Sequence, residues 1–289
     1  MAYKIKTEES SHWYDRSGNS MHTVPKKSSK TGETRNIGRT ACRERVQMPA
    51  VAEALGIVAN EGLVRWKMGQ VAYAATQIAR QDGDDDETFA DRIVLNSMNY
   101  TREAADFGEL MHSAIEDYLL TGHTPDQLDV RNDKVEEFWG PVREWLDANI
   151  ESVVASEYTV VSSVGYAGRV DLKVRLKGEA RMMVCAENDN APLCDGLVIL
   201  DFKTRNPALN GQLLSYDKEL WQGSAYSAAD PDTHRHNAMI PFCNLYIGSK
   251  EPGNLRFKAY STEEMNNGTA FFGHALQMWV LMKGYDPSF

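Results

Sequence analysis

The fold is decided by Tyr166–Leu176, which reads YAGRVDLKVRL, and by Leu197–Thr204, which reads LVILDFKT. In the first segment apolar residues alternate with charged residues, the period-2 pattern of a β-strand with one buried face. The second segment begins as an apolar run, which is typical of a central strand buried on both faces. Each strand carries one aspartate, Asp171 in the first and Asp201 in the second. If the two strands are neighbours, these carboxylates converge.

Helical and strand patterns surround these two strands. The apolar spacing predicts helices before them, two further strands after them, and helices between and behind those strands. The expected helices are 49–59, 62–79, 101–120, 131–150, 220–229 and 261–283, and the other expected strands are 153–161, 182–186, 242–247 and 255–260. The fold class is therefore α/β (α+β), with a helical N-terminal region and helices that flank a mostly antiparallel, mixed central β-sheet.

The composition is that of a globular protein. Of the 289 residues, 42% are hydrophobic, which is enough for a substantial core and excludes a disordered chain. No apolar run approaches the ~20 residues of a membrane span, and no segment near Met1 resembles a secretion signal. The four cysteines are too scattered for a disulfide scaffold. We therefore expect a soluble intracellular protein with reduced thiols and no membrane contact.

Charge is distributed unevenly along the chain. Residues 1–45 contain ten Lys or Arg and five Asp or Glu, a net charge of about +5, whereas the whole chain carries −10. Basic residues that could contact phosphates in this segment are Lys26, Lys27, Lys30, Arg35 and Arg39. The same composition is typical of a solubilising, partly ordered arm, and composition alone favours that second interpretation.

The patterns divide the chain into three parts. Residues 1–46 form the basic, partly ordered arm, residues 47–150 a helical region, and residues 151–289 the sheet with its C-terminal helices. The second and third parts are expected to form one integrated domain. A turn-rich segment at 179–196 interrupts the sheet and is interpreted as an insertion.

The strand around Asp201 also carries a lysine on the same face. Side chains at positions i and i+2 of a strand share a face, so Asp201 and Lys203 project together while Leu200 and Phe202 point the other way. Two adjacent carboxylates repel each other, and a divalent cation such as Mg²⁺ or Mn²⁺ removes that conflict. An ordinary ion pair at a strand end is the simpler explanation of a lone Asp-x-Lys.

Three other polar features stand in order around these strands. His112 lies beside the apolar stripe of its expected helix, where a histidine is more often a core residue than a ligand. Glu157 lies within a strand pattern, where it either faces solvent or takes part in a site. Gln222 and Tyr226 are four residues apart and share one helix face, which alone indicates packing.

Taken together, the order of these motifs resembles the RecB-like branch of the PD-(D/E)XK nuclease superfamily. The motifs in order are His112, Glu157, Gly168-x-x-Asp171, Asp201-x-Lys203 and Gln222-x-x-x-Tyr226. The helical segments Pro49–Val51, Leu63–Lys67 and Gly108–His112 are similar to helices of the mitochondrial genome maintenance exonucleases and related phage exonucleases. The resemblance covers roughly residues 47–226 and implies a restriction-endonuclease-like core.

The resemblance implies a role for each of these residues. The metal ligands would be His112, Asp171, Asp201 and the backbone carbonyl of Phe202. Lys203 would be the catalytic lysine, Glu157 would lie near the metal, and Gln222 and Tyr226 would position the lysine, the water or the scissile phosphate. Arg205 would join the basic arm in contacting DNA. One or two Mg²⁺ or Mn²⁺ ions are implied. No iron–sulfur cluster is expected, because only Cys243 follows the core.

The function expected from the resemblance is a metal-dependent DNA exonuclease that hydrolyses phosphodiester bonds at single- or double-stranded ends. A recombination or replication protein is a further expected partner, as in phage recombination, and the location would be the cytoplasm of a bacterial or phage-infected cell. Two alternatives stay open. One is a non-catalytic module that binds DNA ends or nucleoprotein, and the other is an endonuclease or nickase.

Overall fold

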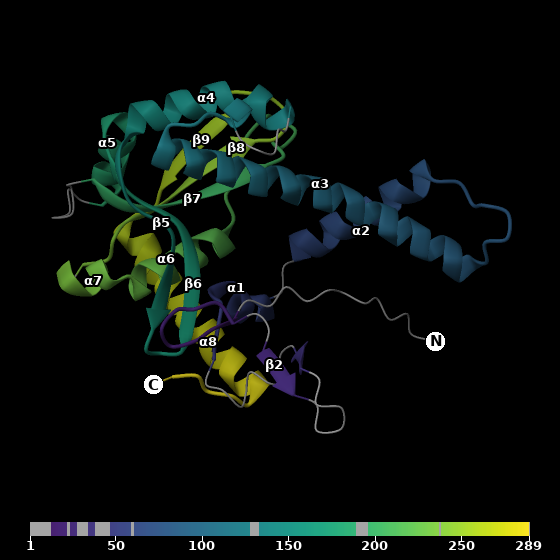
Figure 1. Cartoon of the computed structure of the whole chain (residues 1–289), viewed down its shortest axis with the longest axis horizontal. Coiled ribbons are helices and arrows are strands. Elements are labelled where there is room, and N and C mark those ends of the chain that lie inside the picture. Colours follow the sequence, from purple (N-terminus) through teal and green to yellow (C-terminus); the bar gives the residue numbers. More distant parts are fainter. Residues whose placement is uncertain are drawn as a thin grey trace.

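The computed structural model describes residues 13–21, 24–27, 34–37, 47–58, 61–127, 133–188, 196–236 and 238–288. Their element order is shown in Figure 1. The strands are β1 Trp13–Tyr14, β2 Val24–Lys27, β3 Thr34–Ile37, β4 Met48–Pro49, β5 Ile150–Ser162, β6 Tyr166–Leu176, β7 Leu197–Arg205, β8 Phe242–Gly248 and β9 Leu255–Ala259. The α-helices are α1 Val51–Ala54, α2 Glu61–Gln77, α3 Asp86–Thr121, α4 Asp133–Asn149, α5 Gly178–Glu187, α6 Asp217–Ala229, α7 Pro231–His236 and α8 Thr262–Lys283. Short 3₁₀ turns are η2 Leu55–Ile57 and η3 Pro125–Gln127.

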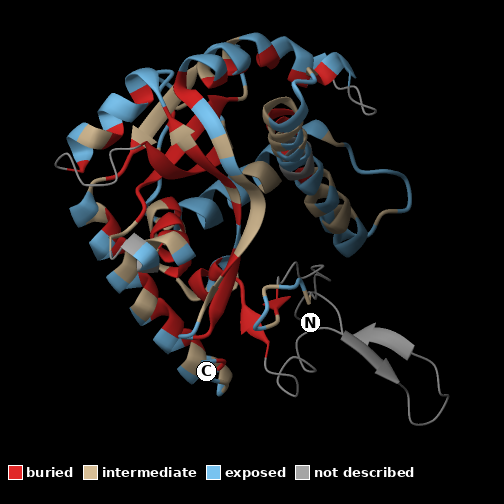
Figure 2. Cartoon of the chain, turned by 60° about the vertical axis from the view of Figure 1, so that its left-hand side comes forward, coloured by how far each residue is buried: buried red, intermediate tan, exposed pale blue. Residues whose placement is uncertain are grey.

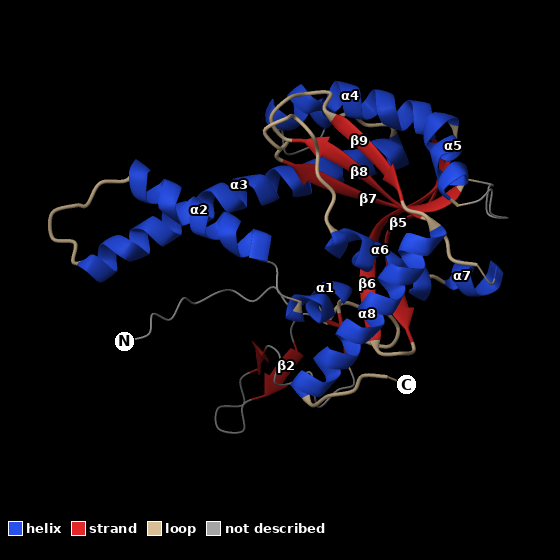
Figure 3. Ribbon diagram, turned by 180° about the vertical axis from the view of Figure 1, so that it is seen from behind, coloured by secondary structure: helices blue, strands red, loops and turns tan. Residues whose placement is uncertain are grey.

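The central sheet has five strands in the order β5-β6-β7-β8-β9. All neighbouring pairs are antiparallel except β7 and β8, which run parallel. A parallel pair needs a crossover connection, and here α6 and α7 lie between the two strands in the chain. The prediction of a mostly antiparallel, mixed sheet flanked by helices is confirmed, including the β8–β9 hairpin (Figure 3).

Both faces of the central strand β7 are buried, as its apolar run predicts. Val198, Leu200 and Phe202 join a core cluster with residues of α3, α4 and α5. Leu197 and Ile199, which alternate with them, join a second cluster with residues of α1, α6 and α8. Figure 2 shows this buried sheet with the exposed outer faces of the helices around it. The middle strand is thus held rigidly from both sides.

Helix α3 is longer than the expected 101–120, because it begins at Asp86 and spans 36 residues. The side chain of Asp85 accepts a hydrogen bond from the backbone N–H of Thr88 (2.8 Å), which caps the helix. The acidic segment Asp82–Asp85 is therefore a loop whose last residue is the N-cap of α3. Figure 1 shows the first half of α3 and the whole of α2 extending away from the sheet.

The segment Met182–Ala186 was expected as a strand, and that prediction is wrong. These residues lie in helix α5. Ala180 and Val184 are four positions apart and buried, so one helical face packs on the core while Met182 and Met183 are exposed. Alanine, methionine and arginine favour a helix, and the short apolar run carries no strict alternation. The rest of the expected insertion, 189–195, lies outside the described residues.

The N-terminal segment meets the C-terminal part of the chain. Strand β1 pairs with β4, and the ring of Trp13 lies 5.8 Å from that of Trp279 in α8. Strands β2 and β3 form a separate antiparallel pair. Of the predicted phosphate-contacting residues, Lys30 and Arg39 and the side chains of Lys26, Lys27 and Arg35 lie outside the described residues. Within the described residues, no helix is both long and apolar enough to cross a membrane.

Candidate active site

The candidate site lies where β6 and β7 stop pairing. Their ladder ends at Leu172 opposite Leu200, so Asp171 and Asp201 occupy the next position on each strand. At this position the side chain of Asp171 accepts the hydrogen bond that a main-chain carbonyl would accept in a continuous ladder. The backbone N–H of Phe202 donates to Asp171 Oδ2 (3.1 Å). The opening between the strands is therefore flanked by two carboxylates.

Lys203 brings a positive charge to this opening. Its Nζ lies 2.6 Å from Asp201 Oδ2, as the strand period predicts for side chains at i and i+2. The lysine side chain is 25% exposed, whereas that of Asp201 is 6% exposed. The ammonium group thus stands between a buried carboxylate and solvent, where it is accessible to a substrate.

His112 approaches the same opening from α3. Its Nε2 lies 3.0 Å from the carbonyl oxygen of Phe202, and its Nδ1 lies 3.4 Å from Asp171 Oδ2. Helix α3 reaches the strand because Gly108 lacks a side chain: a Cβ there would lie 3.1 Å from Thr204 Oγ1. The structure therefore brings His112, Asp171, Asp201, the Phe202 carbonyl and Lys203 together.

The opposite side of the opening is closed by α6. Gln222 Nε2 donates to the hydroxyl of Tyr226 (2.8 Å), so the two residues share a face as their spacing predicts. Burial raises the pKa of Tyr226 well above its usual value, and the negative charges of Asp201 and Asp171 raise it further. The phenol consequently stays protonated at neutral pH and lies within the field of both carboxylates.

Asp201 experiences several opposing influences. Burial raises the pKa of its carboxyl, the Lys203 ammonium lowers it, and the negative charge of Asp171 raises it again. The pKa lies above the usual range because desolvation outweighs the lysine. Two neighbouring carboxylates, one of them buried, are therefore an electrostatic arrangement that a further cation would stabilise.

Replacing Gly168 with alanine is expected to disturb this arrangement. A Cβ on Gly168 would lie 2.3 Å from the ring of Tyr226, so the ring must move. Overpacking of this kind destabilises a core by about 1–3 kcal/mol. Gly69→Ala in α2 is the matched control, because nothing lies within 4 Å of its Cβ and alanine favours a helix by about 0.5–1 kcal/mol. Urea denaturation gives the free energy of unfolding of each variant. Equal values for Gly168→Ala and Gly69→Ala would contradict the packing argument.

Glu157 is placed differently from the other motif residues. In the β5–β6 register it lies opposite Asp171, between the pairs Ser156–Leu172 and Tyr158–Val170. Its carboxylate, however, contacts the guanidinium of Arg169. Its φ of 47° is in the left-handed region that non-glycine residues rarely adopt. The irregular backbone turns this side chain along the sheet toward Arg169.

Arg205 also has a partner within the protein. Its guanidinium contacts the carboxylate of Glu219 and lies 4.5 Å from the centre of the Tyr216 ring. Burial lowers the pKa of Arg205. The arginine therefore links β7 to the beginning of α6, and an approaching phosphate would compete with Glu219 for it.

Sequence reasoning missed a group of buried polar residues beside Asp201. They are Glu219 in α6, Asn244 and Tyr246 in β8, and Tyr260, which follows β9. One signal was present: Asn244 interrupts the apolar strand FCNLYIG at Phe242–Gly248, where an amide needs a buried partner. The identity of that partner follows only from the parallel register, which places Asn244 beside Asp201.

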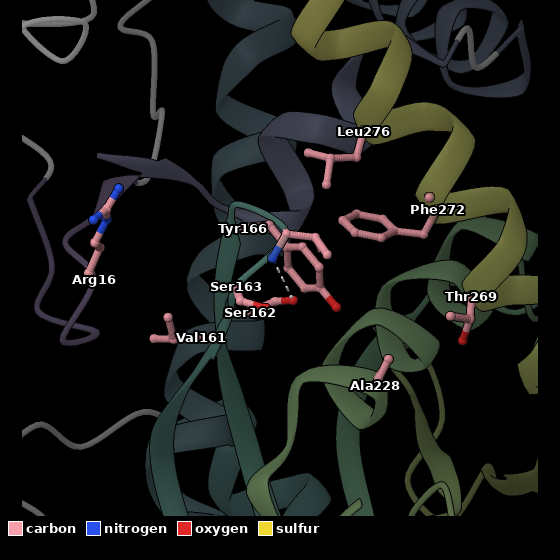
Figure 4. Close-up of a pocket in the computed structure, with 11 residues that line it drawn as sticks. Arg16, Val161, Ser162, Ser163, Tyr166, Ala228, Thr269, Phe272 and Leu276 are labelled. Atoms are coloured by element: carbon pink, nitrogen blue, oxygen red, sulfur yellow. Dashed lines mark hydrogen bonds between the residues drawn. The ribbon is translucent and has the colours of Figure 1, made fainter. Parts of the chain in front are cut away.

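The described residues contain no group of three or more His, Cys, Asp or Glu side chains arranged closely enough to hold a metal ion. A separate cavity of about 650 Å³ lies between the β5–β6 turn, α6 and α8 (Figure 4). Arg16, Ser162 and Phe272 are among the residues that line it, and none of the predicted site residues does. The cavity is therefore distinct from the candidate site.

Comparison with protein families and with curated proteins assigns no function to these residues. No protein-family model matches the chain, and no curated protein matches it significantly.

Proposed function

We propose that the protein is a metal-dependent deoxyribonuclease that hydrolyses phosphodiester bonds at DNA ends. One observation carries the proposal: two carboxylates, Asp171 and Asp201, flank the opening between two central strands, and the ammonium of Lys203 contacts one of them. Paired carboxylates with a neighbouring lysine are suited to hydrolysis of a phosphodiester, because its transition state gains negative charge on oxygen. The five-stranded mixed sheet is consistent with a restriction-endonuclease-like core.

The residue types at the opening suit a hard divalent cation, and the side chains, which are not arranged closely enough to hold one in this structure, would have to move together on binding. Both ring nitrogens of His112 face acceptors, Phe202 O and Asp171 Oδ2, yet a neutral imidazole has one N–H and can satisfy only one of them. A cation among these groups would remove the conflict. His112, Asp171, Asp201 and the Phe202 carbonyl would hold Mg²⁺ or Mn²⁺, whose preferred ligands include carboxylate and carbonyl oxygens. When bound, the ion would lower the pKa of water and polarise the phosphate.

The remaining residues act on the substrate. Lys203 is a partly exposed cation at the opening, so it would hold the attacking water or neutralise charge that develops on the phosphate. Gln222 and Tyr226 present an amide and a phenol from α6 that would orient the lysine or a phosphate oxygen. Because the whole chain carries −10, DNA contacts must be confined to local basic surfaces, and the N-terminal arm supplies one by sequence. We further propose that the protein acts with a DNA-processing partner and that it is located in the cytoplasm.

The proposal is tested with end-labelled linear DNA, single- and double-stranded, and a covalently closed circle. We expect Mn²⁺ or Mg²⁺ to be required, the linear substrates to be degraded and the circle to be spared. Asp171→Asn should lower the rate at least about 10²-fold, since a bound ion contributes several kcal/mol to the transition state. Glu151→Gln, an exposed acid on β5, is the control with unchanged activity.

The other outcomes identify the alternatives. Cleavage of the circle would make the protein an endonuclease or nickase. Binding of DNA ends without cleavage in any metal would favour a non-catalytic binding module. Activity that survives in EDTA, or an Asp171→Asn variant as active as the wild type, would contradict the proposed chemistry.

A further inference from the structure

A buried amide lies directly beside the candidate metal-binding carboxylate. Asn244 is fully buried in β8, and the parallel register places it next to Asp201 in β7. Its side-chain Nδ2 donates to Asp201 Oδ2 at 2.8 Å. A buried amide that donates to a buried carboxylate is a strong, charge-assisted contact, because no water competes for either group.

A neighbouring tyrosine contacts the acceptor side of this amide. Tyr260 donates its hydroxyl to Asn244 Oδ1 at 2.9 Å. Burial raises the pKa of Tyr260 to about 12, so the hydroxyl keeps its proton at neutral pH. A flipped amide would place Oδ1 against the Asp201 carboxylate, which would lose that bond and set two acceptors against each other. Tyr260, by donating to Oδ1, supports the orientation in which the donor side of Asn244 faces Asp201.

A second tyrosine anchors the network to α6. The hydroxyl of Tyr246 lies 2.7 Å from Glu219 Oε2, 3.2 Å from the Tyr260 hydroxyl and 3.3 Å from Asn244 Oδ1. Because a hydroxyl has one proton, the shortest contact assigns it to Glu219. Glu219 also accepts from the backbone N–H of Tyr216 (3.1 Å) and contacts Arg205. The network thus joins β7, β8 and α6 and leaves the tyrosines little freedom to move.

The network has a consequence for the two oxygens of Asp201. Oδ2 receives both Asn244 Nδ2 at 2.8 Å and Lys203 Nζ at 2.6 Å. Within the described residues, Oδ1 receives no hydrogen bond. We propose that Asn244 is a positioning residue: together with Lys203 it occupies Oδ2, so that the carboxylate presents Oδ1 to the divalent cation, and Tyr260 sets the amide in the required direction. The inference rests on the proposed function and adds to it two residues, Asn244 and Tyr260, that orient a metal ligand.

The test measures Mn²⁺ binding by calorimetry on the metal-free full-length protein, with the melting temperature recorded for each variant. Asn244→Leu keeps the volume and removes the donor, and we expect Mn²⁺ affinity to fall about 10- to 100-fold, as for other residues that orient metal ligands. Tyr260→Phe keeps the amide but removes its orienting bond, so a smaller loss of a few-fold is expected. If Asn244→Leu fails to fold, Tyr260→Phe alone still tests the proposal.

Tyr166→Phe is the matched control. It removes another buried tyrosine hydroxyl, which donates to the carbonyl of Ala225 at 2.9 Å and lies outside the network. We expect it to lower the melting temperature as Tyr260→Phe does while Mn²⁺ affinity stays at the wild-type value. A purely structural role for Tyr260 and Asn244 predicts instead that melting temperature falls and Mn²⁺ affinity does not change, which would overturn the proposal.

Nuclease assays separate this inference from the proposed function. In the Asn244 and Tyr260 variants, the Mn²⁺ concentration for half-maximal cleavage should rise, while kcat at saturating Mn²⁺ should largely recover. A wild-type protein that binds Mn²⁺ but cleaves no DNA refutes the nuclease and leaves the positioning role to be judged from affinity. Wild-type protein without Mn²⁺ affinity overturns both. Wild-type cleavage with unchanged variants overturns the positioning role alone.

Discussion

Lys203→Ala is expected to lower the rate of DNA hydrolysis by about 10²–10³-fold, the usual effect of removing one group that stabilises developing charge. The lysine ammonium contacts Asp201 at 2.6 Å and remains partly exposed, so a phosphate or an attacking water can reach it. Alanine removes the charge without leaving a buried acceptor unpaired, since Asn244 still donates to Asp201 Oδ2. The fold should therefore tolerate the change.

Two comparisons make this result specific to the chemical step. Mn²⁺ affinity of Lys203→Ala, measured by calorimetry, should change by no more than a few-fold, because the proposed ligands are intact and Asn244 still donates to Asp201 Oδ2. Lys177→Ala, which removes an exposed lysine before α5, should cleave DNA at the wild-type rate. Single-turnover cleavage at saturating Mn²⁺ gives the relevant rate. A Lys203→Ala variant with full activity would remove the lysine from the mechanism.

Asp230→Ala is expected to reduce the free energy of unfolding by about 3–5 kcal/mol, the usual cost of removing one partner of a buried ion pair. Asp230 is fully buried and accepts from Lys173 Nζ (2.7 Å) and from the Tyr158 hydroxyl (2.7 Å). Lys173 is itself 5% exposed, and its second partner is Asp232, also at 2.7 Å. Loss of Asp230 thus leaves the buried ammonium with Asp232 as its remaining carboxylate partner and the buried phenol without its acceptor.

The origin of this cost is tested by removing both charges. Lys173→Met combined with Asp230→Leu should be clearly more stable than Asp230→Ala, because apolar groups of similar volume often replace a buried ion pair without loss. Arg143→Ala breaks an exposed pair with Asp147 and should cost less than about 1 kcal/mol. Guanidinium denaturation followed by fluorescence measures all three. A double variant less stable than Asp230→Ala would show that the charge pair is not the cause.

Much of the sheet could be predicted because its strands carry simple periodic patterns. The alternation in Tyr166–Leu176 predicted β6, and the apolar run from Leu197 predicted β7, both of which the structure contains. The last helix was expected to begin at Ser261, where the side chains of Ser261 and Glu264 form a reciprocal cap. In each case a local physical rule, either strand alternation or backbone capping, determines the element without help from distant residues.

The remainder depends on contacts between distant parts of the chain. The run at Met182–Ala186 is too short for its period to separate strand from helix, and packing of Ala180 and Val184 decides for helix. Asn244 could be recognised as a buried polar residue, but its contact with Asp201 spans 43 positions. The side chain of Glu157 could not be placed, because its positive φ is a local departure from the regular strand.

The crossover between β7 and β8 determines when the candidate site can form during synthesis of the chain. His112 and Phe202 lie 90 positions apart, and Asp201 gains its amide partner only after β8 has been made and has paired in parallel with β7. Contacts of such long range form late in folding, because loop closure must precede them. A nascent chain that has not reached Gly248 therefore has no complete site, whatever secondary structure its helices have already formed. The proposed chemistry at the opening therefore requires that the central strand has neighbours on both sides.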